Sequence, residues 1–568
     1  MTEPPSERPP ADRLPAEHPP DDRPRTGHPS GTPPPRQPSP DHAPAGQPLH
    51  GQAAVDALTR ARFALSDAGR AAAIARQHAA GKLSARERIA RLTDAGSFHE
   101  IGGFIEPKRD TFDTDGLQAP ADGVVTGHAT IDGRPACVAA FDYTVLGGSN
   151  GRIGGHKLER LAAHALEHGC PLVLLLDGGG HRIQEGLDSR HFAEGSTFFQ
   201  TMALLSGWVP TVAVMMGPGF AGPSNFAGLA DFVVMVRGTS TMGIAGPALV
   251  KAATGEEVDK ETLGGAATQV DRHGVADLAA ADDDEALRLV RRYLGYLPSH
   301  AQQPAPVVAT GDDAARRDES LLTVIPQNRR RAYDIRKVIG AIADAGTVFE
   351  IKPTYAKNLV TAFVRFDGRP AGIVANQPLH IAGALDAPAC EKGAHFVSLC
   401  DAFGLPLVYL IDLPGFLLGS GAERSSLARR SARLLFELGQ ASVTRISVVL
   451  RKGYGLGYIA MCGGRSFDAD LCVAWPTAEI CAMSVEGAVD VAYQRQVAAA
   501  ADPAARRAEL IGRFGEQLGA IHAAAHFGID DAIDPRDTRP LIIATLQRCG
   551  VRKRHLRQPA RHHGISPI

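Results

Sequence analysis

The pattern of hydrophobic and polar positions predicts alternating helices and buried strands. Short apolar runs bounded by Gly, Pro or Asp are typical of strands buried on both faces of a sheet. Four such runs lie at residues 172–176, 211–216, 407–411 and 446–450. Helix-like stretches at residues 157–168 and 390–403 precede the first and the third of them. This alternation predicts an α/β fold with a largely buried sheet.

Residues 195–230 carry no charged side chain, yet they do not predict a membrane span. Pro210, Pro218 and Pro223 interrupt the segment. A single helix through these prolines would lose several backbone hydrogen bonds. We therefore expect a helix, the strand at 211–216, a glycine-rich turn and another helix.

The chain contains an internal repeat. Residues 131–136 recur with one change at residues 366–371. Asp177 recurs as Asp412, an offset of 412 − 177 = 235 positions, and the strands at 212–216 and 446–450 keep almost the same offset. One offset across separate motifs predicts two homologous domains. We place these domains at residues 51–300 and 325–550, with a linker at residues 301–324.

Both ends of the chain differ in composition from these domains. Residues 1–50 hold sixteen of the 40 prolines and few large apolar side chains, which predicts a disordered Pro-rich N-terminal tail. No apolar run follows Met1, so a secretory signal peptide is not expected. The basic residues within 551–568 form a short run without interleaved aromatic side chains, which indicates a solvated tail.

Charge and cysteine content narrow the functional classes. The 60 Lys and Arg residues nearly balance the 62 Asp and Glu residues, giving a net charge of −2, so nucleic acid is not the expected ligand. The 8 cysteines are scattered and no pair has C-x-x-C spacing, which argues against a disulfide scaffold or a zinc ribbon. We expect a cytoplasmic protein with reduced thiols and without a metal.

Glycine-rich loops follow the four predicted strands. They occupy residues 177–186, 217–223, 412–416 and 451–457. The carboxyl ends of buried strands are where α/β folds bind ligands, and glycine lets backbone N–H groups approach a ligand closely. A single such loop would indicate only a tight turn, but four loops paired by a repeat favour an oxyanion site. The phosphate-loop motif is absent from the sequence, and the first predicted strand is not followed by G-x-G-x-x-G, which argues against phosphate-loop and dinucleotide-binding sites there.

Several longer motifs resemble one protein family. Residues 80–550 are similar to the carboxyltransferase (β) subunit of biotin-dependent acyl-CoA carboxylases of the acetyl- and propionyl-CoA type. The motifs that carry the resemblance lie at residues 81–88, 177–180, 182–186, 254–258, 263–266, 373–378 and 474–478. Within the first of them, Ser84 and Glu87 also have the spacing of a helix capping box.

The resemblance implies a fold, an assembly and a set of partners. It implies two crotonase-like domains per chain, a homo-hexamer, and an active site between the first domain of one protomer and the second domain of another. The chain would transfer a carboxyl group from carboxybiotin to the α-carbon of an acyl-CoA. Because the sequence lacks a Met-Lys-Met biotinylation motif, biotin would be carried by a partner subunit together with biotin carboxylase. We expect neither a membrane nor a nucleic acid as a partner.

The resemblance also assigns site residues. The reaction develops negative charge on two oxygen atoms, one of the thioester and one of biotin, so two oxyanion holes are expected. The resemblance maps these holes, as the catalytic residues, to Gly179 with Gly180 and to Leu456 with Gly457. It assigns substrate binding to Gly147, Gly148, Phe220, Ala221, Gly222 and Ile459.

Three positions depart from the family pattern. Leu456 stands within a segment that is usually Gly-Gly-Ala, and a backbone donor there requires the side chain to point away. Ile459 stands where propionyl-CoA enzymes often carry Asp, which suggests a larger or more apolar acyl group. His181 stands where Ala is common, and we expect a histidine at a helix start rather than a catalytic group.

Two other functions stay open at this point. The same chemistry in reverse would make the chain a decarboxylase of malonyl-type CoA thioesters, releasing CO2 without ATP. A non-catalytic scaffold subunit of a mixed acyl-CoA carboxylase complex is the other alternative, and Leu456 is its main support.

Overall fold

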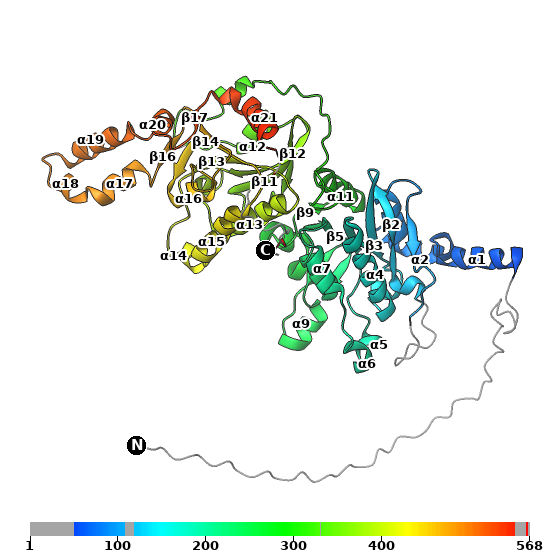
Figure 1. Cartoon of the computed structure of the whole chain (residues 1–568). Helices are drawn as coiled ribbons and strands as arrows, with labels where there is room; N and C mark the ends of the chain where they lie inside the picture. The colour runs from blue at the N-terminus through cyan, green and yellow to red at the C-terminus, as the bar shows by residue number, and fades with distance from the viewer. Residues whose placement is uncertain (1–49, 108–118, 330, 551, 553–563, 566–568) are drawn as a thin grey trace, which may run out of the picture. The chain divides into compact units, whose positions relative to one another are not determined.

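The computed structural model describes residues 50–107, 119–329, 331–550, 552 and 564–565. The predicted disorder of the N-terminal tail and most of the basic C-terminal tail therefore lie outside the described residues. Both sheets of the chain belong to one compact unit, Thr59–Ile568 (Figure 1). The boundaries given above for the domains and the linker stay predictions.

The first half of the chain forms one sheet and its helices. Its helices and strands are α1 (Gly51–Leu65), α2 (Ala71–Ala79), α3 (Ala85–Leu92), β1 (His99–Ile101), β2 (Val124–Ile131), β3 (Arg134–Phe141), α4 (Arg152–His168), β4 (Leu172–Leu176), α5 (Ile183–Gly186), α6 (Ser189–Phe192), α7 (Phe198–Leu205), β5 (Thr211–Met215), β6 (Pro218–Phe220), α8 (Gly222–Gly228), β7 (Phe232–Val236), β8 (Thr241–Gly243), α9 (Pro247–Thr254), α10 (Lys260–Gly264), β9 (Leu278–Ala280) and α11 (Asp283–Tyr296).

The second half forms another sheet with its own helices. Its elements are α12 (Ile335–Ile342), β10 (Phe349–Ile351), β11 (Leu359–Phe366), β12 (Arg369–Asn376), α13 (Ala387–Ala402), β13 (Leu407–Leu413), α14 (Ser420–Arg424), α15 (Leu427–Gln440), β14 (Arg445–Tyr454), α16 (Gly455–Ala460), β15 (Leu471–Ala474), β16 (Glu479–Cys481), α17 (Val485–Ala492), α18 (Gln494–Ala498), α19 (Pro503–Gly515), α20 (Ala520–Ala525), β17 (Asp531–Ala532) and α21 (Thr538–Cys549).

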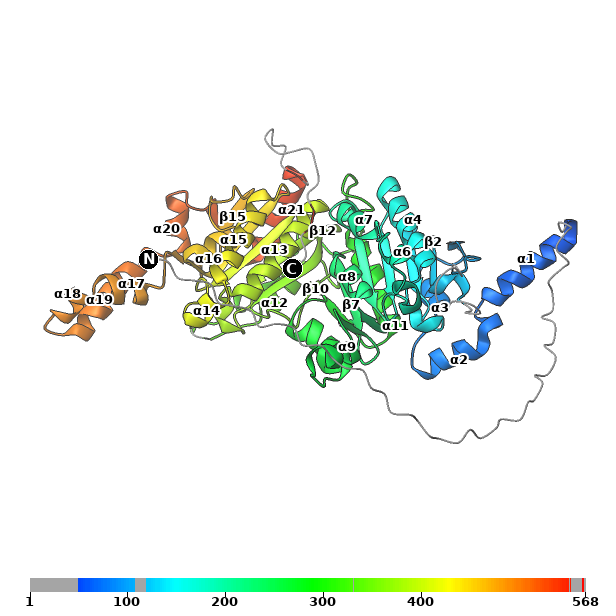
Figure 2. The same ribbon diagram turned by 90° about the horizontal axis from the view of Figure 1, so that it is seen from below.

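The two sheets have the same topology, which confirms two homologous α/β domains. Their strand orders are β1-β2-β3-β4-β5-β7-β9 and β10-β11-β12-β13-β14-β15-β17, with β16 added beside β14. In each sheet the first three strands are antiparallel and the strands that follow are parallel. The central strands are buried along their whole length, as the continuous apolar runs predicted. Figure 2 shows the two helix-covered sheets from a second direction.

Local predictions from the sequence hold with small shifts of boundary. The strand expected at residues 172–176 is β4, whereas β13 and β14 extend beyond residues 411 and 450. The capping box is confirmed, because the N–H of Glu87 donates to Ser84 Oγ at 3.0 Å and the N–H of Ser84 donates to Glu87 Oε2 at 2.8 Å. Pro218–Phe220, expected as part of a turn, forms the short strand β6 paired with β8.

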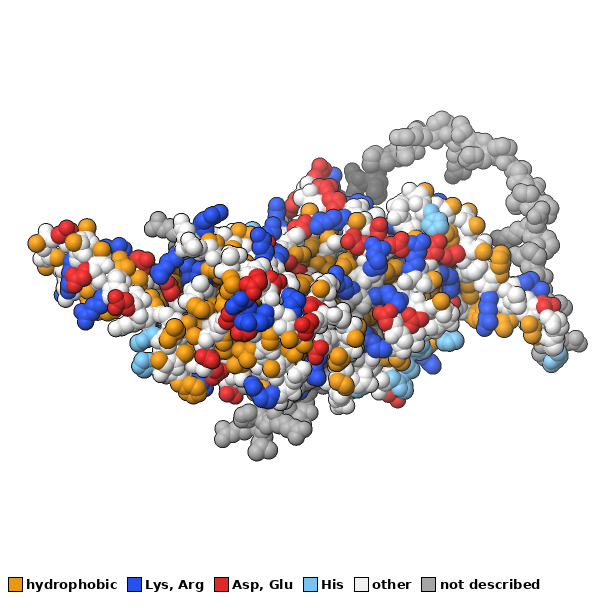
Figure 3. Space-filling model, turned by 90° about the horizontal axis from the view of Figure 1, so that it is seen from above, with side chains coloured by type: hydrophobic (Ala, Val, Ile, Leu, Met, Phe, Trp, Pro, Cys, Tyr) orange, Lys and Arg blue, Asp and Glu red, His pale blue; other side chains and the backbone are white. Residues whose placement is uncertain are grey.

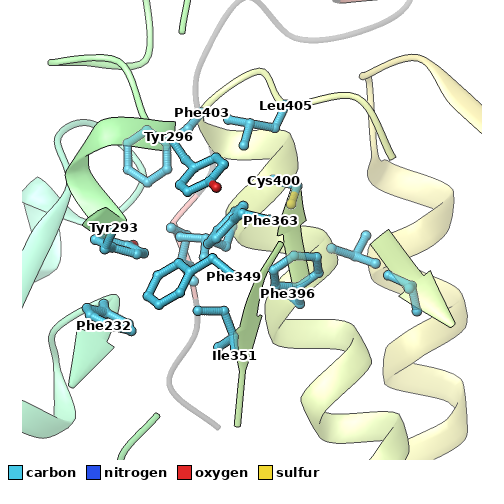
Figure 4. Close-up of a cluster of buried hydrophobic side chains, with 14 of the residues drawn as sticks. Phe232, Tyr293, Tyr296, Phe349, Ile351, Phe363, Phe396, Cys400, Phe403 and Leu405 are labelled. Atoms are coloured by element: carbon cyan, nitrogen blue, oxygen red, sulfur yellow. The ribbon is translucent and has the colours of Figure 1, made fainter. Parts of the chain in front are cut away.

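A cluster of aromatic rings joins the two domains (Figure 4). Tyr293 and Tyr296 project from α11, the last helix of the first domain. The ring centroid of Tyr293 lies 6.0 Å from that of Phe363 on β11, and the ring of Tyr296 lies 5.7 Å from Phe363 and 6.1 Å from Phe349 on β10. All four side chains are buried, so the hydrophobic core is continuous from one domain to the other.

Charge is dispersed on the face drawn in Figure 3, where acidic and basic side chains alternate without forming a region of one sign. This distribution agrees with the net charge of −2. Among the described residues, no helix combines the length and the apolar character needed to cross a membrane.

Candidate active site

The glycine-rich loop after β4 is packed backbone against backbone. A Cβ atom on Gly178 would lie 2.0 Å from the carbonyl oxygen of Gly148, and a Cβ on Gly148 would lie 2.1 Å from that of Asp177. The N–H of Gly179 donates to the carbonyl oxygen of Gly147 at 3.1 Å. The structure therefore brings Gly147 and Gly148 against the predicted oxyanion loop, and only glycine fits at this contact.

Gly180 has the geometry of an available backbone donor. Its φ of +95° lies in the region that favours glycine, and a Cβ there would lie 3.1 Å from the carbonyl oxygen of Phe220. Its N–H has no hydrogen-bond partner in the part of the chain that the structure describes. Phe220 and Ala221 border the loop, and Gly222 follows them as the first residue of α8.

Buried ion pairs fix the start of this loop. Asp177 is fully buried at the end of β4, where its carboxylate accepts from Lys82 Nζ at 2.7 Å and from Arg88 Nη1 at 2.8 Å. Arg88 also donates through Nε to Asp283 at 2.8 Å. Burial lowers the pKa of Lys82. The motif at residues 81–88 thus fixes the start of the loop, since Lys82 and Arg88 are the two of its cations that pair with Asp177.

A second set of ion pairs holds the far side of the loop. Arg182 is buried and its Nη1 donates to Asp122 at 2.6 Å and to Glu185 at 2.5 Å. Burial raises the pKa of Asp122, and the neighbouring Arg182 opposes that rise. The Asp122 carboxylate also accepts from the N–H of Gly154 at 2.6 Å, which ties the loop to the first turn of α4. Arg182 and Glu185 therefore have a positioning role within the residues 182–186 motif.

His181 lies beside Gly180 at the protein surface. Its ring stacks on that of His191 with centroids 5.4 Å apart, and partial burial lowers its pKa. His181 precedes α5 by two residues, near the helix start at which it was expected.

Leu456 and Gly457 lie in the first turn of α16, directly after β14. The first N–H groups of a helix have no acceptor within the helix. Leu456 is 53% exposed, so its side chain points away from the core, whereas Gly457 beside it is buried. A Cβ on Gly457 would lie 2.9 Å from Gly415 Cα, so this turn contacts the loop after β13. Ile459 is half-buried in the same helix.

Gly415 is a candidate donor that sequence reasoning did not single out. It lies 235 positions after Gly180, has a φ of +123°, and its N–H also has no partner among the described residues. The bridge between Asn150 and His181 recurs between Leu385 and Phe416 at this same offset. The internal repeat was the signal that could have identified Gly415.

The same backbone strain recurs around both loops. Leu146 and Gly147 have φ values of 48° and 64°, and their equivalents Ile381 and Ala382 have values of 41° and 55°. Left-handed conformations are costly for side chains such as Leu and Ile, and such strain tends to occur at functional sites. Both copies thus hold the loop after the central strand against the same strained turn.

The predicted residues fall into two groups. The first surrounds Gly180 in the first domain, and the second surrounds Leu456 and Gly415 in the second domain. This geometry defines a duplicated crotonase-like enzyme with backbone donors at the same strand end of each copy.

Comparison with known proteins identifies the family. Residues 76–565 match the model of the carboxyl transferase domain, and the chain belongs to this family. The chain is 41% identical over 514 residues to the methylmalonyl-CoA carboxyltransferase 12S subunit of Propionibacterium freudenreichii subsp. shermanii, covering 90% of this chain and 97% of that one. The predicted fold and the expectation of an acyl-CoA carboxyltransferase subunit are confirmed.

Two further similarities carry weight. The chain is 41% identical over 493 residues to the methylmalonyl-CoA decarboxylase subunit alpha of Veillonella parvula, covering 87% of this chain and 94% of that one. A crystal structure of the transcarboxylase 12S hexamer with methylmalonyl-CoA bound matches with a TM-score of 0.87 at 39% identity, covering 93% of this chain and 100% of that one.

Proposed function

We propose that the chain transfers a carboxyl group from carboxybiotin, carried on a partner subunit, to the α-carbon of an acyl-CoA. The observation that carries this proposal is the pair of unpartnered N–H groups at Gly180 and Gly415, which occupy equivalent strand ends of the two domains within the described residues. A reaction that develops negative charge on two oxygens needs donors at two places, and the duplicated domain offers them.

The residues of the chain divide this work. Carboxybiotin supplies the carboxyl group when it is bound. In the first domain, the N–H of Gly180 donates to one developing oxyanion, beside the acyl-CoA contacts proposed for Gly147, Gly148 and Phe220–Gly222. In the second domain, the N–H groups of Gly415, Leu456 and Gly457 face the other oxyanion. Each donor contributes about 2.7–4 kcal/mol to transition-state stabilisation.

The test uses the chain co-purified with its biotinylated subunit. We expect bicarbonate to be incorporated into an acyl-CoA in a reaction that depends on ATP and is blocked by avidin. The panel should contain short, medium and long acyl-CoAs, because the length of the acyl chain decides how well it fills the acyl pocket. Failure to carboxylate every member of the panel, with an active biotin carboxylase shown in the same preparation, would contradict the proposal.

The decarboxylase alternative is favoured by one observation, the 41% identity to a methylmalonyl-CoA decarboxylase subunit. The same donors would stabilise the same oxyanions in reverse. Release of CO2 from a malonyl-type CoA thioester without ATP, by the chain with its biotinylated partner, would assign this direction.

We also propose a homo-hexamer, supported by the hexamer of the matched transcarboxylase structure. In that assembly, Gly180 of one copy would face Leu456 of another copy across a subunit interface. The mass of the purified chain in solution, measured by light scattering, tests this assembly.

Two substitutions at Leu456 separate the side chain from the backbone donor. Leu456→Ala is expected to leave kcat within a few-fold of wild type, because the side chain points outward. Leu456→Pro removes the N–H at a position where a helix tolerates proline, and is expected to lower kcat about 100-fold. Steady-state carboxylation checks both. Equal activity of the two variants would remove Leu456 from the oxyanion site, and an inactive wild type would favour the scaffold alternative.

Ile459→Asp is expected to shift the acyl preference toward shorter chains. A carboxylate at this half-buried position disfavours contact with an apolar acyl group, and one methylene in a hydrophobic pocket is worth about 10–200-fold in specificity. We expect the ratio of kcat/KM for long over short acyl-CoA to fall about 10-fold. Ile459→Leu serves as the control and should preserve the ratio. An unchanged ratio in Ile459→Asp would exclude this residue from the acyl pocket.

A further inference from the structure

Three potential metal ligands meet in the first domain. His128 on β2 and Cys137 on β3 are direct cross-strand neighbours, and His164 comes from α4, which packs on these strands. The nitrogen and sulfur atoms of the three side chains all lie within 4.8 Å of one another. They are brought together by folding, since the sequence separates them by nine and 27 positions.

The distances in this cluster match those between ligands of one tetrahedral ion. His128 Nδ1 lies 3.6 Å from Cys137 Sγ, and Cys170 Sγ lies 3.5 Å from Cys137 Sγ. Zinc bonds of about 2.3 Å to sulfur and about 2.0–2.1 Å to nitrogen place tetrahedral ligands about 3.5 Å apart for sulfur and nitrogen and about 3.8 Å apart for two sulfurs. Cys170 neighbours Cys137 but does not belong to the group whose ligand atoms all lie within 4.8 Å of one another.

The second domain provides an internal comparison. At an offset of 235, the four positions are occupied by Phe363, Gly372, Leu399 and Leu405. Phe363 and Gly372 are cross-strand neighbours in the same register as His128 and Cys137. The fold can therefore fill this place with an apolar cluster, and packing alone does not require two histidines and two cysteines in the first domain.

An ion can reach the cluster from solvent. A hollow of about 280 Å³ is lined by His128 and His164, and also by Lys157, Arg160 and Glu167. Cys137 is buried and does not itself line the hollow, so an ion would reach it past the two histidines. A Cys137 thiolate would offset part of the charge of a divalent ion, which limits its repulsion from Lys157 and Arg160.

We propose that His128, Cys137 and His164 bind Zn²⁺ as its three protein ligands. Imidazole and thiolate donors in tetrahedral reach are the set that zinc prefers. The ion would tie α4 to β2 and β3, so its role is to stabilise the first domain rather than to take part in carboxyl transfer.

The test measures zinc on the full-length chain. After treatment with a chelator and dialysis, the protein is titrated with Zn²⁺ against a chromogenic competitor, and one equivalent per chain is expected to bind. Co²⁺ in place of Zn²⁺ should give the visible and near-ultraviolet bands of tetrahedral cobalt bound to thiolate. These readouts do not depend on carboxylation activity.

Matched variants locate the site. His128→Phe combined with His164→Leu installs the residues of the second domain and is expected to weaken Zn²⁺ binding at least about 10-fold. Cys137→Ser should abolish the cobalt–thiolate band. This single variant replaces the double variant as the test if the double variant does not fold. His522→Phe removes one member of an exposed histidine pair on α20, whose rings lie 4.9 Å apart, and should leave binding unchanged. No bound equivalent in wild type, or unchanged binding in Cys137→Ser, would overturn the proposal.

Discussion

Gly180→Ala is expected to lower kcat about 100- to 1,000-fold with little change in KM. The added Cβ would sit 3.1 Å from the Phe220 carbonyl oxygen at a φ of +95°, which alanine rarely adopts, so the loop must shift and its N–H must turn. Removal of one oxyanion donor costs about 10²–10³ in kcat. Because the donor acts mainly on the transition state, ground-state binding of the acyl-CoA should persist.

The control for this variant is Gly195→Ala. Gly195 also has a positive φ, +68°, but no atom lies within 4 Å of the position that its Cβ would take. This variant carries the same kind of backbone strain without a neighbour in the donor loop. Steady-state kinetics measure kcat and KM for both variants. A similar loss of kcat in the two would show that backbone strain, rather than loss of the donor, accounts for the effect.

Arg88→Met is expected to destabilise the first domain by about 3–5 kcal/mol. Arg88 is fully buried and donates to Asp177 and Asp283, so its removal leaves carboxylates buried with Lys82 as the remaining cation. Breaking a buried ion pair costs more than the pair itself contributes, because the remaining charge has lost its partner. Urea unfolding followed by far-ultraviolet circular dichroism measures the change.

Arg91→Met, in the same helix, is the matched control. Arg91 pairs with Asp284 at the surface, where both side chains are nearly half exposed, and such pairs contribute little to stability. We expect its unfolding midpoint to match that of wild type. If Arg88→Met unfolds at the same urea concentration as Arg91→Met, the network beneath the donor loop is not a source of stability.

Much of the fold could be predicted because the chain contains two copies of the same domain. The continuous apolar runs located β4 and β5, and the offset of 235 located their equivalents in the second domain. The full length of β14 was not predictable, because its last residues, Arg451–Tyr454, are polar or glycine and join the sheet through pairing with β16. Pairing between distant strands is a tertiary effect that local pattern does not contain.

The candidate site was predictable in part. Glycine-rich loops at strand ends pointed to Gly180 and to the turn at Leu456, but the direction of the Leu456 side chain depends on where α16 begins. The cluster of His128, Cys137 and His164 gave no signal, because its members come from two strands and a helix and have no ligand spacing in the sequence. Residues that meet only after folding are visible only in the structure.

The aromatic cluster between the domains limits how this enzyme can admit its substrates. Opening a hinge at α11 would expose the rings of Tyr293, Tyr296 and Phe363 to water, and full exposure of such a side chain costs about 1.5–3 kcal/mol. A movement of one domain against the other within a chain would therefore be an energetically costly way to open the site. Movement of the short segments around the donor loops, such as α5 and α6, would admit and release substrates without disturbing these buried rings.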